Sequence, residues 1–481
     1  FLAKNGTVID IQNTSSADFS DGINGTSTSE AESGLETIIA YSEGTWTSSG
    51  TGLTALSGSG IIGKPTEIII NKELNMMSRK GIAFFAKDGG KITVNANAEA
   101  YGYGSLIAYA DNGKVEVNSN ITAIDSGVST TANKFNNVGS YAVNGGEITI
   151  SGNSSINGLG ALANGSSSKV DLNGTNNVIN TGISGGLVAQ TGGTVNFNGG
   201  TITNKDNIVN DHSDVTPFYA GGSSKVVFNG ATTIDMYDGI LVSGNASDYS
   251  ASVGGSNKYQ GMSNVNVVLQ DNGVNFGIFD GVSLTWDDSL DSNNTYTNGL
   301  ISIPQFNSVN INGKTYLSSL KNGTLNVTSP TITLDSSSDR YNYISMENEL
   351  VTFSSGTLIS GDVSTGSLKG QGLSLGSNSS ATANTSSGYI NNGTINVTGG
   401  TTSAGIAGMN VAYGQIHNTS TGNVTIDNGA SLFATNGSKI VNDGVLTVTG
   451  SGQGIAAFGK DLAGSISYGN SSIYIENNGT M

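Results

Sequence analysis

The chain has 481 residues, 36 acidic against 19 basic side chains, and a formal net charge of −17. This charge argues against nucleic acid as a partner, because binding nucleic acid depends on neutralising phosphates with lysine and arginine. The 36% of hydrophobic residues, with Val and Ile in short alternating runs, argues against a disordered chain.

The chain contains no cysteine. Extracellular proteins of this size often carry disulfides, so we expect a protein that is exported through a periplasm as an unfolded thread, with a cytosolic protein as the alternative. No run approaches the about 18 apolar residues of a membrane-spanning helix, and the N-terminal residues lack the features of a signal peptide. We therefore expect any targeting or anchoring segment to lie outside these residues.

One phrase recurs along the chain: an apolar or aromatic residue, Ala, a short Gly/Asn/Ser turn, and an alternating strand. Residues 1–11 are the first copy, and a Ser/Thr/Gly-rich interruption follows at about 12–64. From Ala86 onward, the alanines of the phrase are separated by 24, 32, 21, 26 and 31 residues. These copies lie at 85–94, 109–117, 141–150, 162–172, 188–197 and 219–228.

The rhythm is broken again at about 243–261 and at about 272–349. The second of these stretches contains plausible strands such as 323–327, so we expect the solenoid to run through it with longer excursions. The repeat then returns at 393–397, 433–440, 444–448 and 454–457. Both ends of the sequence fall inside repeat phrases, and we therefore expect a segment of a larger protein.

A period of about 22 residues with short strands and tight turns predicts an all-β fold, an elongated parallel β-helix. We expect one continuous solenoid over 1–481, right-handed, with the irregular stretches as insertions. Ile92 and Val94 should point inwards and Thr93 outwards, because side chains alternate across a strand. Gly and Asn suit the turns because they adopt positive φ readily.

Aromatic residues fall into two groups. Those of the repeat phrase are expected to stack in the core or along its flank: Phe85, Tyr109, Tyr141 and Tyr219. Those in the interruptions are candidate contact residues, because solenoid insertions often form the binding face and exposed aromatics with arginine are typical interface anchors. The candidate binding residues are Trp46, Tyr249, Tyr259, Trp286, Asp287, Asp288, Tyr296, Arg340, Tyr341 and Tyr343.

The strongest of these groups places carboxylates around a tryptophan: Asp280, Trp286, Asp287, Asp288 and Asp291. A tryptophan beside carboxylates suits stacking on a sugar with hydrogen bonds to its hydroxyls. A solvated loop anchored by one buried tryptophan is the alternative interpretation.

A polysaccharide-degrading β-helix enzyme is the main alternative function, and such enzymes use carboxylate pairs, or carboxylates with calcium and a base. His212 and His417 have no carboxylate partner at a suitable spacing in the sequence, and no serine lies in a Gly-x-Ser-x-Gly elbow with a plausible histidine. The calcium-binding Gly-Gly-x-Gly-x-Asp nonapeptide does not occur either. The sequence therefore predicts a protein that is not an enzyme, with no catalytic residue, metal ligand or cofactor.

The phrase Gly-Ile-Ala-Phe-Phe-Ala at 81–86, followed by the strand that ends at Val94, resembles the passenger domains of bacterial type V autotransporters. With its Gly-Thr-Ile-Asn-Val strands, high Asn content and lack of Cys, the chain is most similar to the very large fusobacterial autotransporter adhesins. The resemblance implies a passenger domain that projects from the outer membrane at the bacterial cell surface, tethered by a C-terminal barrel outside these residues.

The same resemblance implies adhesion and virulence. Members of the family mediate coaggregation with other bacteria, bind galactose-type host glycans, or engage host cell-surface receptor proteins, including inhibitory receptors of immune cells. A purely structural spacer within a surface fibre is the remaining alternative.

Overall fold

The computed structural model separates the chain into two compact units. Unit 1 comprises Phe1–Gly239, Ser247–Val267 and Gln305–Asn307, and unit 2 comprises Ile240–Ala246, Val268–Pro304 and Ser308–Met481. The residues that the structure describes are 2–4, 8–11, 38–43, 67–71, 73–76, 81–101, 104–124, 137–181, 185–204, 216–237, 239–241, 244–269, 274–275, 279–280, 283–287, 299–302, 305–311, 317–321, 324–327, 331–335, 342–362, 374–379, 386–398, 406–435, 437–450, 453–458 and 474–481.

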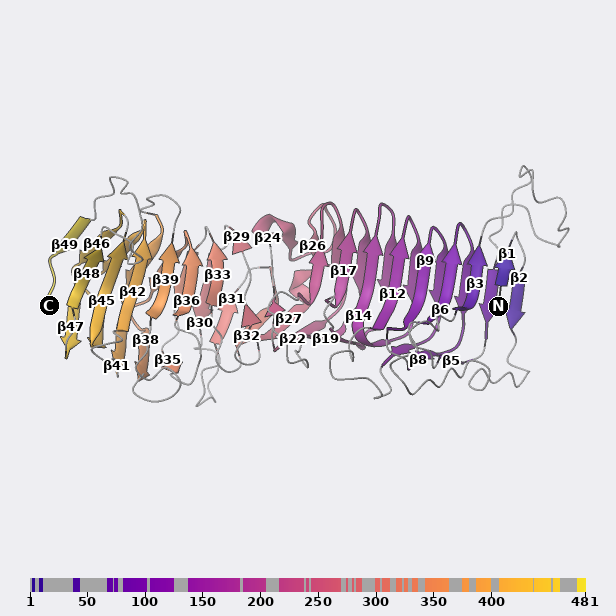
Figure 1. Cartoon of the computed structure of the whole chain (residues 1–481), viewed down its shortest axis with the longest axis horizontal. Helices are drawn as coiled ribbons and strands as arrows, with labels where there is room; N and C mark the ends of the chain where they lie inside the picture. Colours follow the sequence, from indigo (N-terminus) through magenta and orange to yellow (C-terminus); the bar gives the residue numbers. More distant parts are fainter. Residues whose placement is uncertain are drawn as a thin grey trace, which may run out of the picture. The chain divides into compact units, whose positions relative to one another are not determined.

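Unit 1 is a parallel β-solenoid whose successive coils place their strands side by side in three walls (Figure 1). Wall A contains β1 (Leu2–Lys4), β3 (Ile38–Glu43), β6 (Ile82–Lys87), β9 (Leu106–Asp111), β12 (Asn137–Val143), β14 (Ser154–Asn164), β17 (Leu187–Gln190) and β20 (Phe218–Ala220). Wall B contains β2 (Val8–Ile11), β4 (Glu67–Ile70), β7 (Lys91–Val94), β10 (Lys114–Val117), β13 (Glu147–Ile150), β15 (Lys169–Leu172), β18 (Thr194–Phe197), β21 (Lys225–Phe228), β26 (Tyr259–Gln260) and β25 (Tyr249–Ser250).

Wall C of unit 1 contains β5 (Leu74–Met76), β8 (Ala98–Ala100), β11 (Ile121–Ala123), the first part of β14, β16 (Asn177–Asn180), β19 (Gly200–Asn204) and β22 (Thr232–Met236). The long strand β14 belongs to two walls, because its first residues pair with β11 and its later residues pair with β12. Within the interruption expected at 12–64, the described residues 38–43 form β3, which pairs in parallel with β6.

The inward and outward positions follow the alternation that the sequence predicts. Ile92 and Val94 are completely buried, and Thr93 between them lies on the outer face. The register also confirms the spacing of the repeat alanines, since Ala86 pairs with Ala110 and Ala110 with Ala142 in the next coils. The all-β parallel solenoid expected from the repeats is therefore the observed fold.

The recurrence of Ala and Gly in the phrase has a steric cause. A Cβ at Gly146 would collide with the carbonyl oxygen of Ala110 in the preceding coil, and a Cβ at Gly193 would collide with that of Ala163. Only glycine lets the two backbones approach this closely. The turn glycine of one coil therefore packs directly against the alanine of the preceding coil, and this contact recurs along unit 1.

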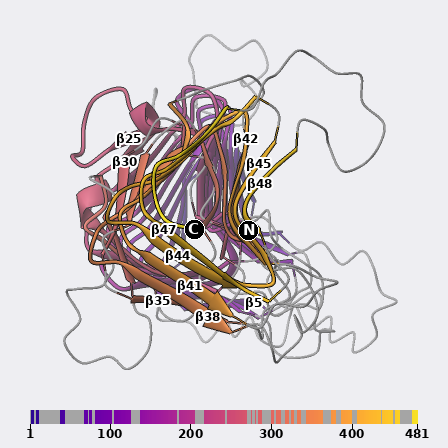
Figure 2. The same ribbon diagram turned by 90° about the vertical axis from the view of Figure 1, so that its left-hand side faces the viewer.

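Unit 2 is also a parallel solenoid with three walls. Seen end-on in Figure 2, β42, β45 and β48 lie along one wall and β38, β41, β44 and β47 along another. Wall D contains β24 (Gly244–Asn245), β29 (Phe279–Asp280), β33 (Leu317–Lys321), β36 (Asn342–Glu347), β39 (Ser374–Ser379), β42 (Ile406–Ala412), β45 (Gly429–Thr435) and β48 (Gln453–Phe458). Wall E contains β35 (Thr331–Asp335), β38 (Leu358–Asp362), β41 (Thr394–Thr398), β44 (Asn423–Asp427) and β47 (Val445–Thr449).

Wall F of unit 2 contains β30 (Ser283–Asp287), β34 (Thr324–Val327), β37 (Leu350–Phe353), β40 (Gly388–Asn391), β43 (Gln415–Asn418), β46 (Lys439–Asn442) and β49 (Tyr474–Asn477). Two further strands form an antiparallel excursion from β30, namely β31 (Gly299–Ser302) and β32 (Ser308–Ile311). The expected strand at 323–327 is thus present as β34, and it pairs in parallel with β37. The remaining described elements are the strands β23 (Gly239–Ile240), β27 (Val265–Leu269) and β28 (Val274–Asn275) and the 3-10 helices η2 (Ala246–Asp248) and η3 (Met262–Asn264).

Candidate functional site

A row of aromatic rings runs along the outer face of wall A in unit 1. Phe85, Tyr109 and Tyr141 occupy the same register position in β6, β9 and β12. Each of these side chains is half-buried, while the alanine that follows it is fully buried. We call these three residues the aromatic row; in the coils that follow, the same register position holds Leu162, the buried Val188 and the exposed Tyr219.

The rings of the aromatic row are in contact but do not cover one another completely. The ring centroids of Phe85 and Tyr109 are 4.7 Å apart, with a tilt of 38° between the ring planes. Those of Tyr109 and Tyr141 are 5.2 Å apart with a tilt of 44°. One ring per coil, at the spacing of parallel strands, makes this a periodic apolar surface.

Polar residues border the aromatic row two to three residues further along the chain. Lys87 of β6 pairs in register with Asp111 of β9. Asn144, which follows β12 and is exposed, donates a hydrogen bond from Nδ2 to Oδ1 of Asp111 at 2.7 Å. Burial raises the pKa of Tyr109, and the charge of Asp111 raises this pKa further. The Tyr109 hydroxyl is therefore protonated at neutral pH and remains a hydrogen-bond donor.

The outer face of the adjoining wall B carries an ion-pair ladder. Lys91 Nζ lies 3.0 Å from Glu67 Oε1 and 3.0 Å from Glu116 Oε2. Lys114 Nζ lies 2.8 Å from Glu116 Oε1 and 3.7 Å from Glu147 Oε2. The lysines of wall B next to the aromatic row are thus neutralised within the protein. We call these five side chains the charge ladder.

The charge ladder shifts the titration of its central members. Burial raises the pKa of Glu116, but hydrogen bonds from Lys114 and Lys91 outweigh it and hold this pKa below its usual value. Burial lowers the pKa of Lys91, but hydrogen bonds to Glu67 and Glu116 outweigh it and raise this pKa. Both shifts favour the charged forms at neutral pH.

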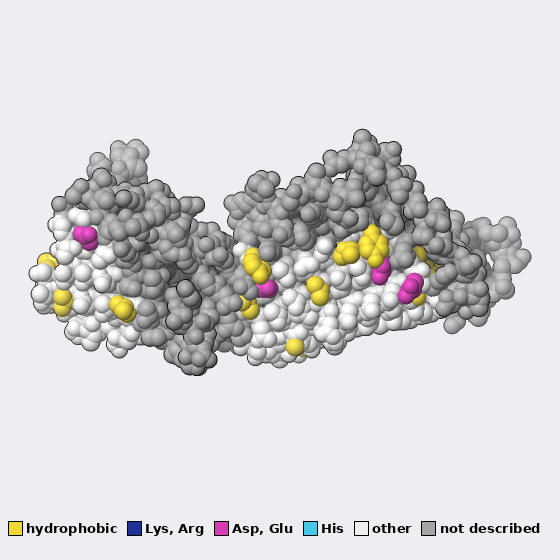
Figure 3. All heavy atoms as spheres, turned by 90° about the horizontal axis from the view of Figure 1, so that it is seen from below, with side chains coloured by type: hydrophobic (Ala, Val, Ile, Leu, Met, Phe, Trp, Pro, Cys, Tyr) yellow, Lys and Arg dark blue, Asp and Glu magenta, His cyan; other side chains and the backbone are white. Residues whose placement is uncertain are grey.

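Another face differs from the surface around the aromatic row. The view in Figure 3 shows small hydrophobic patches and a few acidic side chains among neutral polar ones, with no lysine or arginine on the described residues in view. Among the described large hydrophobic side chains that are exposed, Val178 is 41% exposed and lies on the outer side of β16.

Tyr249 and Tyr259, expected from the sequence to be exposed contact residues, are buried. They are only 4% and 3% exposed, and their rings stack with centroids 4.5 Å apart. The Tyr259 hydroxyl also accepts a hydrogen bond from the backbone N–H of Ala220. This corrects the expectation of an exposed binding loop, because β26 and β25 extend wall B beyond β21 and place both rings in the interior.

Of the other candidate residues, three lie on described strands of unit 2. Trp286 and Asp287 are in β30, where Trp286 pairs in register with Val327 on one side and Ile301 on the other. Tyr343 is in β36, which belongs to wall D, whereas β30 belongs to wall F. The remaining candidates lie outside the described residues: Trp46, Asp288, Tyr296, Arg340 and Tyr341.

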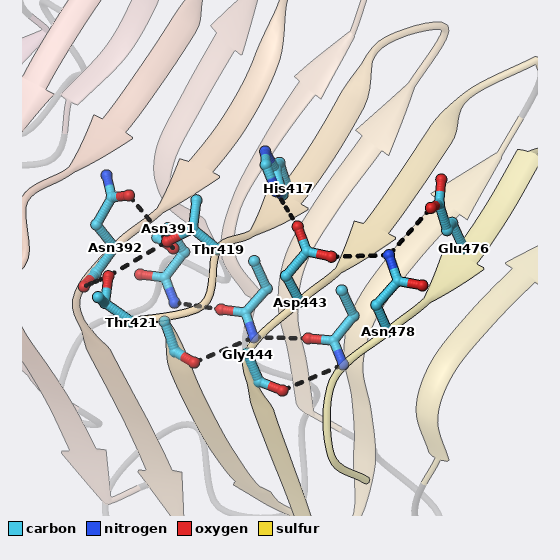
Figure 4. A network of polar contacts seen from close by, with 12 residues as sticks. Asn391, Asn392, His417, Thr419, Thr421, Asp443, Gly444, Glu476 and Asn478 are labelled. Carbon is cyan, nitrogen blue, oxygen red and sulfur yellow. Dashed lines mark hydrogen bonds and ion pairs between the residues drawn. The ribbon is translucent and has the colours of Figure 1, made fainter.

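His417 has a carboxylate partner that the sequence did not reveal. Its Nε2 lies 2.8 Å from Oδ2 of Asp443, which is 26 residues away and one coil further along unit 2 (Figure 4). Hydrogen bonds from Asn478 and His417 lower the pKa of Asp443. Asn478 also donates to Glu476, so His417 belongs to a chain of polar contacts that links successive coils on the outer surface.

Inside the same coils, buried asparagines form a continuous row (Figure 4). Asn391, Asn418 and Asn442 are fully buried. Nδ2 of Asn391 donates to Oδ1 of Asn418 at 2.8 Å, and Nδ2 of Asn418 donates to Oδ1 of Asn442 at 2.8 Å. Asn442 donates in turn to Asn477. We call these four residues the asparagine row, and the bonds among its three buried members are structural because they satisfy polar groups in the interior.

No described group of three or more His, Asp or Glu side chains is placed to hold a metal ion. Within the described part of the chain, no helix is long and apolar enough to cross a membrane.

The residues of the aromatic row were assigned to packing in the sequence analysis. Its residues were recognised as stacking along the solenoid, which the ring distances confirm, but they were not named as contact residues. The signal was present, since Phe85 directly precedes the inward Ala86 and alternation places it outside. The two consecutive buried residues Ala83 and Phe84 interrupt the alternation in β6 and conceal this pattern.

Comparison of the chain with protein-family models, with curated proteins and with solved structures finds no match.

Proposed function

We propose that this chain is part of an exported bacterial surface adhesin, whose β-solenoid presents a contact surface to host cells or to other bacteria. The aromatic row of unit 1 is the observation that carries the proposal. Contacting aromatic rings that stay partly exposed over three coils form a continuous apolar strip, and contiguous apolar surface on soluble proteins marks interaction sites.

The scaffold supports the same role. In a parallel solenoid each coil contacts only its neighbours, so a long array holds its outer face in a fixed and repeating geometry. Many copies on one cell would strengthen individually modest contacts through multivalency. The repeat style and the lack of cysteine, which suit export as an unfolded thread, support a location at the bacterial surface.

The test uses fluorescent beads coated with the purified 481-residue chain and, as a control, beads coated with serum albumin. We expect the coated beads to adhere to cultured epithelial cells or to bacteria of other species, with adhesion that saturates and that soluble chain competes away. Binding no greater than that of albumin beads on both cell types would contradict adhesion and favour a structural spacer.

A further inference from the structure

We propose that residues 247–264 form an internal cap that closes wall B, so that unit 1 stays folded when unit 2 is unfolded. A solenoid wall needs a structure that protects its last strand, because the edge of that strand is otherwise open to further pairing. This inference does not depend on the proposed adhesive function. It follows from the strand order, the hydrogen bonds and the aromatic packing at the end of wall B.

The strand order at the end of wall B reverses the order of the chain. Elsewhere in this wall, each later strand pairs with the far side of the strand before it. The strand β26 instead lies between β21 and β25, since Tyr259 pairs with Val226 on one side and with Tyr249 on the other. The chain therefore folds back, and the two-residue β25 is the last strand of the wall. A strand this short offers little edge for further pairing.

One buried side chain fixes the loop that makes this fold-back. Parallel strands in one sheet are ordinarily joined by about a dozen or more residues, whereas residues 251–258 alone join β25 to β26. The Oε1 atom of the buried Gln260 accepts a hydrogen bond from the backbone N–H of Gly254 at 2.8 Å. Its Nε2 donates to the backbone oxygens of Asn257 at 2.9 Å and Gly255 at 3.3 Å. The amide of Gln260 thus holds the loop to the sheet.

The residues that follow β26 tie the fold-back to the coil before it. Ser263 donates two hydrogen bonds to the backbone oxygen of Ala251, from its N–H at 3.2 Å and from its Oγ at 2.8 Å. Nδ2 of Asn264 donates to the backbone oxygen of Phe228, the last residue of β21, at 2.8 Å. The fold-back is therefore bonded both to itself and to the preceding coil.

Aromatic rings cover the interior at the same end. Tyr259 meets Phe218 edge to face with centroids 5.2 Å apart, and Tyr249 stacks on Tyr259. The buried Phe306 lies beside Tyr249, with centroids 6.3 Å apart. Outside these rings, the loop is exposed and uncharged from residue 252 to 256. Residues of unit 1 itself thus close the apolar interior at the end of wall B, as a solenoid cap does.

The full 481-residue chain carrying Gly388→Ala tests whether unit 1 folds without unit 2. A Cβ at Gly388 would collide with the backbone oxygen of Gln415, and both residues belong to unit 2. Pulsed hydrogen exchange with mass spectrometry is measured along a urea titration. We expect urea concentrations at which β41 and β44 are unprotected while β18, β21 and β26 remain protected. Protection lost from both sets of strands together would overturn the inference.

The variant Gln260→Ala tests the cap itself. Loss of its three loop bonds should speed exchange in β21 and β26 about tenfold or more and leave β7 and β10 within about twofold of the parent, because damage in a solenoid spreads mainly to adjacent coils. The matched control is Ser256→Ala, which alters an exposed residue of the same loop and should keep all four strands within about twofold.

Equal exchange in β21 and β26 for the Gln260→Ala and Ser256→Ala chains would overturn the cap. Protection lost throughout unit 1 of the Gln260→Ala chain, β7 and β10 included, would contradict a structure that acts only at the end of the wall. The Gly388→Ala measurement keeps Gln260 in place, so it decides whether unit 1 folds by itself even if the Gln260→Ala chain does not fold.

Discussion

A single buried asparagine in unit 2 satisfies polar groups of two neighbouring coils. Asn418 accepts a hydrogen bond from Asn391 and donates one to Asn442, all within the interior. Buried polar groups are costly when they lose a partner, so each member of the asparagine row depends on its neighbours. The row therefore fixes the register of these coils as well as adding to their stability.

Replacing Asn418 with alanine should lower the free energy of unfolding by about 2–3 kcal/mol, because it leaves the Asn391 amide and the Asn442 carbonyl oxygen without these bonds. Urea denaturation followed by circular dichroism measures the change. The matched control is Asn396→Ala, on the exposed face of β41, which should stay within about 0.5 kcal/mol. Equal losses for the two variants would contradict the role of the row.

At the scale of the strand, the charge ladder links β4, β7, β10 and β13 through side chains on one face. Glu116 is its centre, since it contacts both Lys91 and Lys114. Its pKa lies below the ordinary value of 4.5 in the folded protein, so its contribution to stability is present above about that pH and is lost as the pH falls through the folded pKa. The raised pKa of Lys91 gives a contribution present below 10.5 and lost at higher pH.

We therefore predict that Glu116→Gln lowers the free energy of unfolding by about 1 kcal/mol at neutral pH and makes stability less dependent on pH below 4.5. Urea midpoints measured from neutral to acidic pH would show the two proteins converging as the solution becomes acidic.

Glu147→Gln is the control for this prediction. Its carboxylate is 54% exposed and 3.7 Å from Lys114, so its removal should have a smaller effect at every pH. A constant difference between the Glu116→Gln chain and the parent across the acidic range would show that ionisation of Glu116 does not contribute.

The strands and their pairing between coils could be predicted from the sequence, because the repeat phrase marks each strand and the spacing of its copies marks each coil. Alanine spacing gave the coil register, as the pairing of Ala86 with Ala110 shows. Side-chain contacts between coils could not be predicted from the repeat phrase. His417 and Asp443 are 26 residues apart, and only the stacking of coils with variable loops brings them together.

The structure of the stretches that interrupt the repeat was also not predictable from the sequence, for a different reason. Loss of the phrase around Tyr249 and Tyr259 indicated a loop, whereas the structure uses both rings as interior packing at the end of wall B. Burial of an aromatic residue depends on which strand covers it, and that neighbour was hidden in a region without repeat signals. The residues of the aromatic row, in contrast, were expected to stack in the core or along its flank, and the ring distances confirm that they stack.

At the scale of the whole molecule, a solenoid transmits stability mainly between adjacent coils. Gly388 has φ +122, and a Cβ there would collide with the carbonyl oxygen of Gln415 in the next coil of unit 2. Gly388→Ala should therefore destabilise its surroundings by about 3 kcal/mol. Gly356→Ala is the control, because a Cβ at Gly356 has no heavy atom within 4 Å.

Hydrogen exchange measured by mass spectrometry should show how far this damage spreads. We predict faster exchange in β40 and β43 of the Gly388→Ala chain, with unchanged protection in β7, β10 and β13 of unit 1. Protection lost equally in both units would instead show that the chain unfolds as one cooperative body.

The asparagine row also has a consequence for how the gene that encodes this chain can gain or lose coils. Gln415 pairs with Lys439, so residues 415–438 amount to one coil, and their excision would set Asn391 directly against Asn442. Identical side chains then meet across the new junction, and unequal recombination could add or remove a coil without any compensating substitution. A chain lacking 415–438 should remain folded, with an unchanged circular dichroism spectrum per residue; an unfolded product would show that this coil is not interchangeable.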